Sequence, residues 1–188
     1  MPHRHPKRPP IPTLWLMTDE RIGDGLWRAI DSLPRGAGIV FRHYSTEPGK
    51  RRALFAQVAR MARRKRLILV RAGPVPLAKE AGTHGRGTLR PGGIRTWAAH
   101  SRKEAVAGKR AGADALFVSP LYPTRSHPVA GTLGPVRAAA IGQALDIPVI
   151  ALGGMNAARF RKLRGLGFHG WAAIDAWLPD QKRKAVPI

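Results

Sequence analysis

The chain has 188 residues, which suits one domain with a sizeable core. Its 33 Lys and Arg residues against 11 Asp and Glu give a formal net charge of +22, which favours anionic partners: phosphorylated metabolites, nucleic acid or an acidic membrane surface. The absence of cysteine excludes disulfides and thiolate chemistry and predicts a cytoplasmic location. No apolar run is long enough to span a membrane, so we expect no membrane partner.

Both ends of the chain are predicted to lie outside the folded domain. Residues 1–12 are basic and proline-rich and lack the apolar core of a signal peptide, which indicates a flexible basic tail. Residues 179–188 form a second basic tail. The folded domain is therefore predicted over 13–178.

The first half of the chain alternates apolar runs with helical patterns. Strands are predicted at 13–18, 38–42 and 66–71, and helices at 25–32 and 49–65. In the second helix the apolar residues repeat with a helical period, which leaves Arg51, Arg52, Arg60, Arg63 and Arg64 for its outer face. Between 72 and 93 the pattern is weak: a turn or two of helix at 75–81 and a minimal strand at 83–86. The seven residues 87–93 are too few for a crossover helix, so the fourth helix is predicted to be short or missing.

The second half of the chain is more regular. Strands are predicted at 94–99, 116–119, 149–152 and 171–174, and helices at 134–145 and 156–166. A capping box at Ser101–Glu104 opens a further helix that runs to about 111. Eight strands that alternate with helices predict a TIM (β/α)8 barrel, an α/β fold whose sites lie at the carboxyl ends of the strands. A doubly wound open sheet is the main alternative.

Two glycines after the seventh predicted strand are the best local indication of an anion site. Gly153 and Gly154 let the backbone approach a phosphate closely, and Asn156 is a suitable N-cap for the helix that follows. A glycine pair in this place is equally typical of an ordinary tight turn.

Several polar residues follow other predicted strands. Arg42 could grip a pyrophosphate in a bidentate way, or be one surface arginine among many. His100 could act as an acid or base, or be a structural histidine. Thr124 and His127 lie on a proline-stiffened loop that suits a phosphate clamp or any ordered loop. Asp175 would repel a phosphate unless it faces away or pairs with a base. No set of acids and histidines has metal-like spacing.

These segments resemble one family. The matching segments are Leu14-Trp-Leu-Met-Thr-Asp19, Phe41-Arg42, Ala99-His100-Ser101, Gly112-Ala-Asp114, Ser119-Pro-Leu-Tyr-Pro-Thr124 and Ile147-Pro-Val-Ile-Ala-Leu-Gly-Gly-Met155. Together they resemble thiamine-phosphate synthase and the related TenI-type thiazole tautomerase over about residues 14–177. The resemblance implies a TIM barrel that joins hydroxymethylpyrimidine pyrophosphate to a thiazole phosphate with the help of Mg²⁺. The sequence is also compatible with a homo-oligomer.

The resemblance also implies roles for particular residues. Arg42 matches the family's pyrophosphate arginine, and Thr124 matches the threonine of the loop after strand six. Gly153 and Gly154 match the thiazole-phosphate glycines, and Ile174 lies in the backbone that completes that phosphate cup. His100 matches a histidine shared with the tautomerase branch.

The chain departs from the family pattern mainly where the metal would bind. The family's Gln-Phe-Arg-Glu-Lys is Val40-Phe-Arg-His-Tyr44 here, its Asn-Asp after strand three is Arg71-Ala72, and the aspartate after strand four has no counterpart in 85–88. The loop lysine is His127, the serine of the phosphate cup is Asp175, the serine after strand five is Ala98, and the tautomerase histidine is Pro120. Mg²⁺ is thus expected from the family while its ligands are absent. Arg71 and Arg86 are predicted to replace part of its charge.

Three functions follow as hypotheses. The first is a synthase with slow, weakly magnesium-dependent activity. The second is a TenI-like protein that binds a phosphorylated ligand, or a tautomerase-like one, without the synthase reaction. The third, argued from the charge alone, is a nucleic-acid-associated protein, and it is the least favoured because the basic residues lack interleaved aromatic residues.

Overall fold

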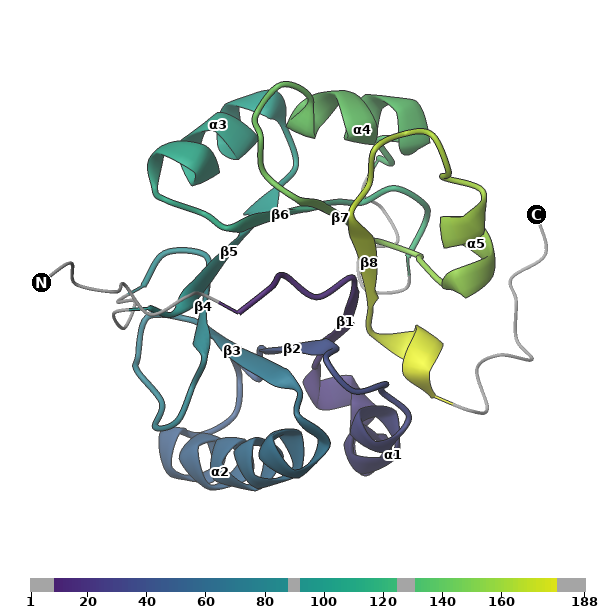
Figure 1. Ribbon diagram of the computed structural model, residues 1–188. Coiled ribbons are helices and arrows are strands. Elements are labelled where there is room, and N and C mark those ends of the chain that lie inside the picture. Colours follow the sequence, from purple (N-terminus) through teal and green to yellow (C-terminus); the bar gives the residue numbers. More distant parts are fainter. Residues whose placement is uncertain (1–8, 88–91, 125–130, 179–188) are drawn as a thin grey trace, which may run out of the picture.

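The protein folds as a closed eight-stranded parallel barrel (Figure 1). The computed structural model describes residues 9–87, 92–124 and 131–178. Its strands are β1 (Leu14–Met17), β2 (Gly38–Phe41), β3 (Ile68–Ala72), β4 (Gly82–His84), β5 (Ile94–Ala99), β6 (Ala115–Val118), β7 (Val149–Ala151) and β8 (Gly170–Ala173). Because β1 pairs with both β2 and β8, the barrel prediction is confirmed and the open-sheet alternative is wrong.

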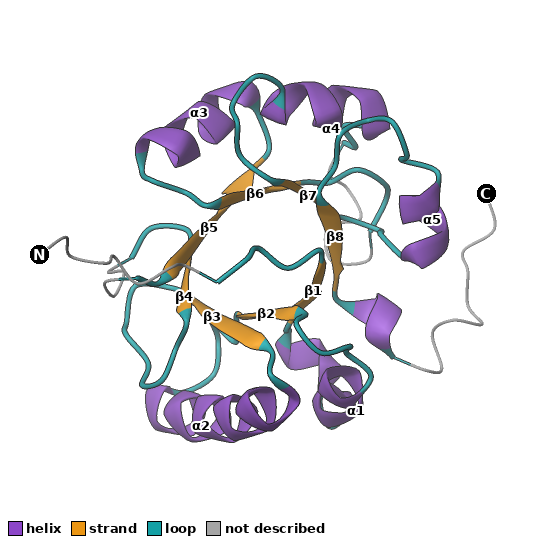
Figure 2. Ribbon diagram, viewed as in Figure 1, coloured by secondary structure: helices purple, strands orange, loops and turns teal. Residues whose placement is uncertain are grey.

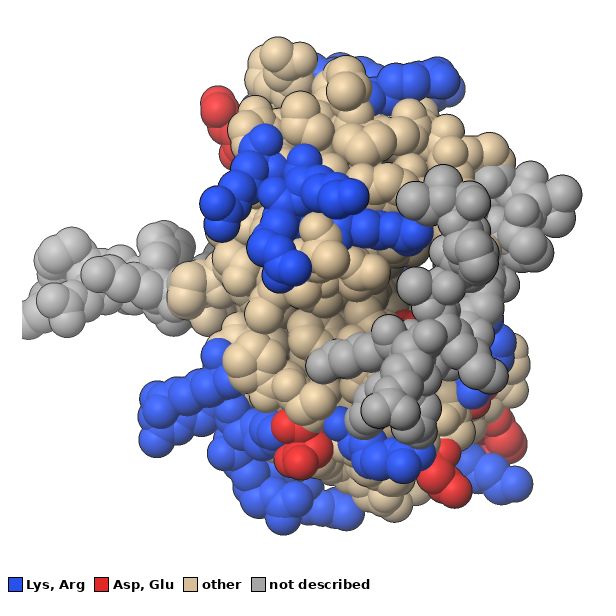
Figure 3. Space-filling model, turned by 90° about the vertical axis from the view of Figure 1, so that its right-hand side faces the viewer, with Lys and Arg blue, Asp and Glu red and all other residues tan. Residues whose placement is uncertain are grey.

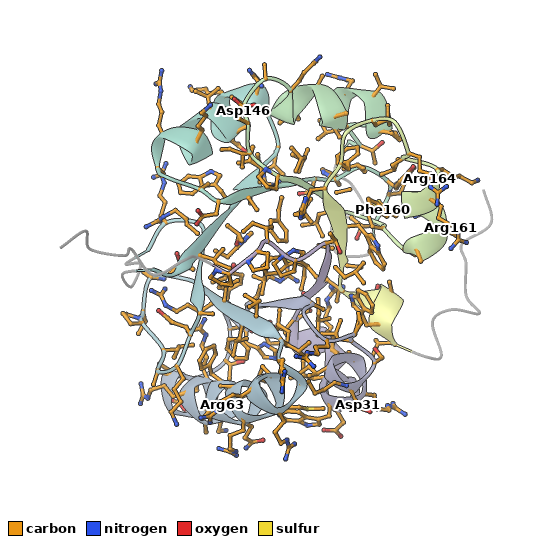
Figure 4. The ribbon with its side chains drawn as sticks, in the orientation of Figure 1. Asp31, Arg63, Asp146, Phe160, Arg161 and Arg164 are labelled. Carbon is orange, nitrogen blue, oxygen red and sulfur yellow. The ribbon has the colours of Figure 1, made fainter. Side chains whose placement is uncertain are left out.

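Within the described residues, five α-helices and two short 3₁₀ helices lie outside the barrel (Figure 2). They are η1 (Glu20–Ile22), α1 (Gly25–Asp31), α2 (Pro48–Lys65), α3 (Arg102–Arg110), α4 (Pro135–Gly142), α5 (Ala157–Arg161) and η2 (Asp175–Trp177). The helix predicted at 156–166 is shorter than expected, since α5 ends at Arg161 and turns follow. Figure 4 shows Arg161 and Arg164 pointing outward on this side, while Phe160 packs against the core.

No helix covers the outside of β4 in the part of the chain that the structure describes (Figure 1). Residues 73–81, between β3 and β4, form bends and turns, so the helix predicted at 75–81 is wrong; Pro74 and Pro76 disfavour helical continuation there. The described residues between β4 and β5 also lack a helix, as predicted.

A polar row takes the place of the missing helices. Arg71, Thr83 and Arg95 are register partners on β3, β4 and β5. Because side chains alternate along a strand, and Val70, Ala72 and Ile94 belong to the interior core, the row lies on the outer face. The guanidinium of Arg95 donates hydrogen bonds of 3.1 Å each to the carbonyls of Gly85 and Gly87 in the next loop.

The arginine at the other end of this row holds the preceding loop. Its Nε lies 2.6 Å from Oε2 of Glu80, and the two side chains are almost completely buried. The same carboxylate accepts a hydrogen bond from the amide of Leu77, which is itself buried. A buried ion pair and charged hydrogen bonds thus fix the two helix-free connections to the barrel wall.

The barrel interior is filled by large apolar side chains. The rings of Trp15 and Phe117 meet edge-to-face with centroids 5.2 Å apart. A Cβ atom at Gly38 would lie 2.1 Å from the ring of Trp15, so this glycine makes room for the indole. The interior is therefore a packed core, and ligands are restricted to the ends of the barrel.

Residues 9–12 cover the amino-terminal end of the barrel, which Figure 1 shows as the segment crossing its centre. Ile11 packs against the interior core, and its carbonyl lies 2.9 Å from Nε2 of His169. The carbonyl of Pro12 accepts a hydrogen bond from the indole of Trp15. Ile11 and Pro12, which were assigned to the tail by the prediction, thus pack against the barrel. The rest of both predicted tails, 1–8 and 179–188, lies outside the described residues.

Candidate active site

Arg42 stands at the carboxyl end of β2 and is held there by the neighbouring strand. Its Nε donates to the carbonyl of Thr18, and its backbone amide donates to the hydroxyl of the same threonine. Its Nη2 lies 2.7 Å from Oδ2 of Asp19. The Nη1 group makes no hydrogen bond within the described residues, so this half of the guanidinium can receive an anion.

Asp19 is a carboxylate at this end of the barrel, and two arginines hold it. Arg21 approaches one oxygen at 2.7 Å, and Arg42 approaches the other at the same distance. Burial raises the pKa of Asp19, but the hydrogen bonds from Arg21 and the charges of both arginines outweigh burial, so the pKa lies below its ordinary value. At neutral pH the carboxylate is ionised, and an anionic ligand must compete with it for Arg42.

Arg51 fixes the backbone around Arg42. Although α2 carries it, its side chain turns toward the barrel and donates to the carbonyls of Arg42, His43 and Ala72. Its guanidinium also lies 5.4 Å from the ring centroid of Phe41. The helical period predicts Arg51 on the outer face of α2, and this prediction is wrong because the side chain reaches the barrel. An arginine one turn into the helix that follows a candidate site could have indicated this role.

His84, at the end of β4, is a site residue that the sequence analysis missed. Its Nδ1 lies 2.8 Å from the hydroxyl of Thr96, and its ring meets Phe117 edge-to-face. Burial and the nearby charge of Arg42 lower its pKa to about 4. The imidazole is therefore neutral at physiological pH. The three-residue length of β4 gave no period from which an inward-facing residue could be recognised.

Gly153 and Gly154 follow β7 in backbone conformations that favour glycine, with φ of 93° and 60°. A Cβ atom at Gly153 would lie 2.7 Å from Cα of Pro120, and one at Gly154 would lie 2.6 Å from the carbonyl oxygen of Pro123. The glycines therefore let this loop pack against the loop after β6. Neither amide donates a hydrogen bond to any other part of the described chain, which leaves both available to an anion.

The other predicted residues are placed differently. The amide of His100 and its Nδ1 both lie within 3.0 Å of Oε2 of Glu104 at the start of α3, while Ser101 caps this helix; His100 is thus part of the helix start and its side chain is exposed. Arg71 faces outward toward Glu80 and does not line the mouth, which argues against its predicted contact with phosphate. Arg86 is exposed on the loop after β4.

The remaining candidates lie around the last strands. Thr124 is half-buried in the loop after β6. Ile174 packs partly against the interior core and precedes η2, which Asp175 begins. The positive charge of Arg21 lies close enough to interact with Asp175, so this carboxylate has a basic neighbour, one of the two conditions that the sequence analysis set. His127 lies outside the described residues. These roles in phosphate binding stay predictions.

The donor set does not fit the magnesium ion that the family resemblance implies. No group of three or more His, Asp or Glu side chains within the described residues is placed to hold a metal ion. At the mouth, Asp19 is already engaged by Arg21 and Arg42. Mg²⁺ prefers several oxygen ligands in octahedral geometry, which a carboxylate held by two guanidinium groups does not offer.

Replacing Gly153 by alanine is expected to destabilise the fold by about 2–3 kcal/mol, because the new Cβ combines a strained φ with a backbone clash at Pro120. Gly165 provides a matched control, since its φ is 85° and nothing lies within 4 Å of its Cβ position. Its alanine variant should lose only the strain, about 1 kcal/mol. Urea denaturation measures both; equal losses would show that the contact with Pro120 is not restrictive.

The barrel and its arginine-bearing mouth define a TIM-barrel protein with its candidate site at the carboxyl ends of the strands. A family model described as thiamine monophosphate synthase matches residues 17–177. The chain belongs to this family.

Relatives and solved structures agree with this membership. The chain is 32% identical over 108 residues to a thiamine-phosphate synthase of Desulfitobacterium hafniense (strain Y51), covering 57% of this chain and 50% of the relative. It is 28% identical over 183 residues to that of Chlorobium phaeobacteroides, covering 89% of each. The chain thus spans about half the length of some of the curated relatives that it matches. A thiamine phosphate pyrophosphorylase from Pyrococcus furiosus shares the fold with a TM-score of 0.75 and 22% identity, covering 87% of this chain and 86% of the other.

Proposed function

We propose that the chain is a thiamine-phosphate-synthase-type protein of thiamine biosynthesis that binds a pyrimidine pyrophosphate and a thiazole phosphate and joins them. The family match over 17–177 carries this proposal. Arg42 at one side of the mouth and the open amides of Gly153 and Gly154 at another support it, because the reaction needs two separate anion sites.

In this reaction the carbon–oxygen bond between the pyrimidine methylene and pyrophosphate breaks, and pyrophosphate leaves with the electron pair. The thiazole nitrogen then forms the new carbon–nitrogen bond. Arg42 stabilises the charge that develops on the leaving group, and it can do so without reorganisation because Thr18, Asp19 and the backbone contacts of Arg51 already fix its position. The amides of Gly153 and Gly154 hold the thiazole phosphate at the carboxyl end of β7.

The activity is expected to be slow and weakly dependent on magnesium. The test incubates the full chain with both substrates, with Mg²⁺ or with EDTA, and follows thiamine phosphate. EDTA should lower the rate by less than about tenfold, since loss of a metal clamp contributing several kcal/mol would lower it far more. Absence of product under both conditions would overturn the synthase proposal.

A second candidate is a TenI-like protein that binds the phosphorylated ligand, or acts as a tautomerase-like protein, without the condensation. The engagement of Asp19 by two arginines favours it, because no carboxylate in this cluster is left for a metal. Calorimetry with thiazole phosphate, thiamine phosphate and pyrophosphate tests it: binding without product in the assay above supports this candidate, and no heat from any of the three contradicts it.

The surface charge suits anionic ligands in general. Figure 3 shows Lys and Arg gathered in two groups on the side of the molecule that carries α5 and β8, one in the upper half and one along the lower edge. Exposed cations there include Arg161, Lys162 and Arg164. An association with nucleic acid stays a prediction of the charge, and a filter-binding salt titration tests it. In the described residues no helix is both long and apolar enough to cross a membrane.

A further inference from the structure

Two carbonyl groups at the end of β7 are bound by the loop that follows β6. The amide of Leu121 donates to the carbonyl of Leu152 at 2.9 Å, and the amide of Tyr122 donates to the carbonyl of Gly153 at 3.2 Å. In a planar trans peptide the carbonyl and the N–H point in opposite directions. The Leu152 carbonyl shares its peptide with the amide of Gly153, and the Gly153 carbonyl shares its peptide with the amide of Gly154. Both glycine amides therefore point away from the loop after β6.

Arg159 binds the third carbonyl of this segment from the first turn of α5. Its Nη1 donates a hydrogen bond to the carbonyl oxygen of Gly154. A Cβ atom at Gly154 would lie only 3.0 Å from the same Nη1, so the guanidinium packs directly against this glycine. The backbone amide of Arg159 donates to Oδ1 of Asn156 at 2.8 Å, which fixes the turn from which the side chain reaches back.

The ring of Tyr122 supports the same guanidinium. The Cζ atom of Arg159 lies 4.8 Å from the ring centroid of Tyr122, and both side chains are half-buried. A cation–π contact that is partly shielded from water is stronger than one at an exposed site. Tyr122 therefore contacts the glycine segment twice, through its own amide at Gly153 and through its ring by way of Arg159. The loops after β6 and β7 are joined into one unit.

The position of Arg159 distinguishes its role from that of a ligand contact. It lies on the side to which the carbonyls of the segment point, whereas the amides of Gly153 and Gly154 face the other side. Its Nε and Nη2 make no hydrogen bond to any residue that the structure describes, so the fixed contacts of the guanidinium are those to Gly154 and Tyr122. The side chain is thus placed to orient the two amides.

We propose that Arg159 is a positioning residue for the phosphate site at the end of β7. By holding the Gly154 carbonyl beside the ring of Tyr122, it keeps the amides of Gly153 and Gly154 directed toward one phosphate group, and it does not itself touch the ligand. The inference rests on the proposed function for the identity of that ligand, the thiazole phosphate. Arg159 lies outside the segments on which the family resemblance depends.

Substitution of Arg159 should affect one of the two anion sites and spare the other. Calorimetry on Arg159→Ala should show about tenfold weaker binding of thiazole phosphate, the effect of losing one charged hydrogen bond, and unchanged binding of pyrophosphate at Arg42. A variant that merely folds poorly would lose both. Arg161→Ala is the matched control, because it removes the same charge from an exposed side chain that points outward (Figure 4). Equal losses in the two alanine variants would overturn the inference.

Substitutions at Tyr122 test whether the ring acts through Arg159. Tyr122→Phe keeps the aromatic face and should bind thiazole phosphate as the native chain does, whereas Tyr122→Leu removes that face and should bind it more weakly. Combined with Arg159→Ala, Tyr122→Leu should cause little further loss, because residues that act through one contact are not additive. Fully additive losses would show that the two side chains act separately and would contradict the proposed unit.

A further measurement uses the unaltered chain and does not depend on whether the variants fold. In ¹H–¹⁵N NMR spectra, thiazole phosphate should shift the amide signals of Gly153 and Gly154 and change the Nε signal of Arg159 much less. An Nε shift as large as those of the glycines would indicate a ligand contact and overturn the positioning role. Unchanged affinity in a folded Arg159→Ala variant overturns the inference while leaving the proposed function intact. Absence of thiazole phosphate binding to the unaltered chain overturns it at its premise, and the synthase assay judges the proposed function separately.

Discussion

Replacing Glu80 by alanine is expected to reduce the free energy of unfolding by about 3–5 kcal/mol, the range for breaking a buried ion pair by removing one partner. The carboxylate lies 2.6 Å from Nε of Arg71, and the two side chains are 2% and 0% exposed. Without it, the buried guanidinium loses its counter-charge and the amide of Leu77 loses its acceptor. Urea denaturation monitored by tryptophan fluorescence measures the loss.

A variant without either charge shows whether the unpaired guanidinium causes this loss. The combined variant Arg71→Met, Glu80→Leu removes both charges and keeps apolar volume on the outer face, so it should be more stable than Glu80→Ala. Glu104→Ala is a control for loss of a carboxylate at an exposed position and should cost about 1 kcal/mol. A Glu80→Ala variant as stable as Glu104→Ala would contradict the importance of the buried pair.

Replacing Arg42 by alanine is expected to weaken pyrophosphate binding by about 100-fold to 10,000-fold. The reason is the loss of two charged hydrogen bonds, each contributing about 1.5–3 kcal/mol, where each 1.4 kcal/mol corresponds to a tenfold change. If the synthase proposal holds, turnover should fall by a similar factor, because the same guanidinium stabilises the leaving group. Calorimetry and the thiamine phosphate assay measure the two effects.

Two further variants distinguish the geometry of Arg42 from its charge. Arg42→Lys keeps the charge but loses the planar pair of donors, so its affinity should lie between those of the native chain and the alanine variant. Arg60→Ala removes one positive charge from the exposed face of α2 and should bind as the native chain does. Equal losses in Arg42→Ala and Arg60→Ala would mean that pyrophosphate responds only to the overall charge of +22.

The sequence allowed the barrel to be predicted because its strands are short, apolar and separated by helical patterns. The buried runs predicted at 66–71 and 116–119 correspond to β3 and β6, and the capping residue Ser101 located the start of α3. The lack of a helix in the described part of the connection between β4 and β5 was predicted from chain length alone, since 87–93 holds too few residues. These features depend on local composition, which a single sequence displays directly.

The prediction failed where side-chain direction mattered. Arg71 and Arg51 were placed by their position along a strand and a helix, but the pleat turns Arg71 outward to Glu80 and the length of Arg51 lets it reach back over the β2 end. His84 was overlooked because its environment consists of Thr96 and Phe117 from other strands. Such contacts between distant parts of the chain cannot be inferred from spacing.

The polar row on β3, β4 and β5 gives the barrel an uneven resistance to local opening. Most of the wall is sealed by apolar layers between strands and helices, which must be exposed to water when a strand detaches. Around β4 the seal is made of guanidinium groups bound to loop carbonyls and one carboxylate; the buried pair of Arg71 and Glu80 resists opening, but water can replace the bonds from Arg95 to the loop carbonyls at little cost. Since β4 is also only three residues long, this sector should detach and re-form most often. The same strand carries His84, so local opening of this part of the barrel also displaces that side chain.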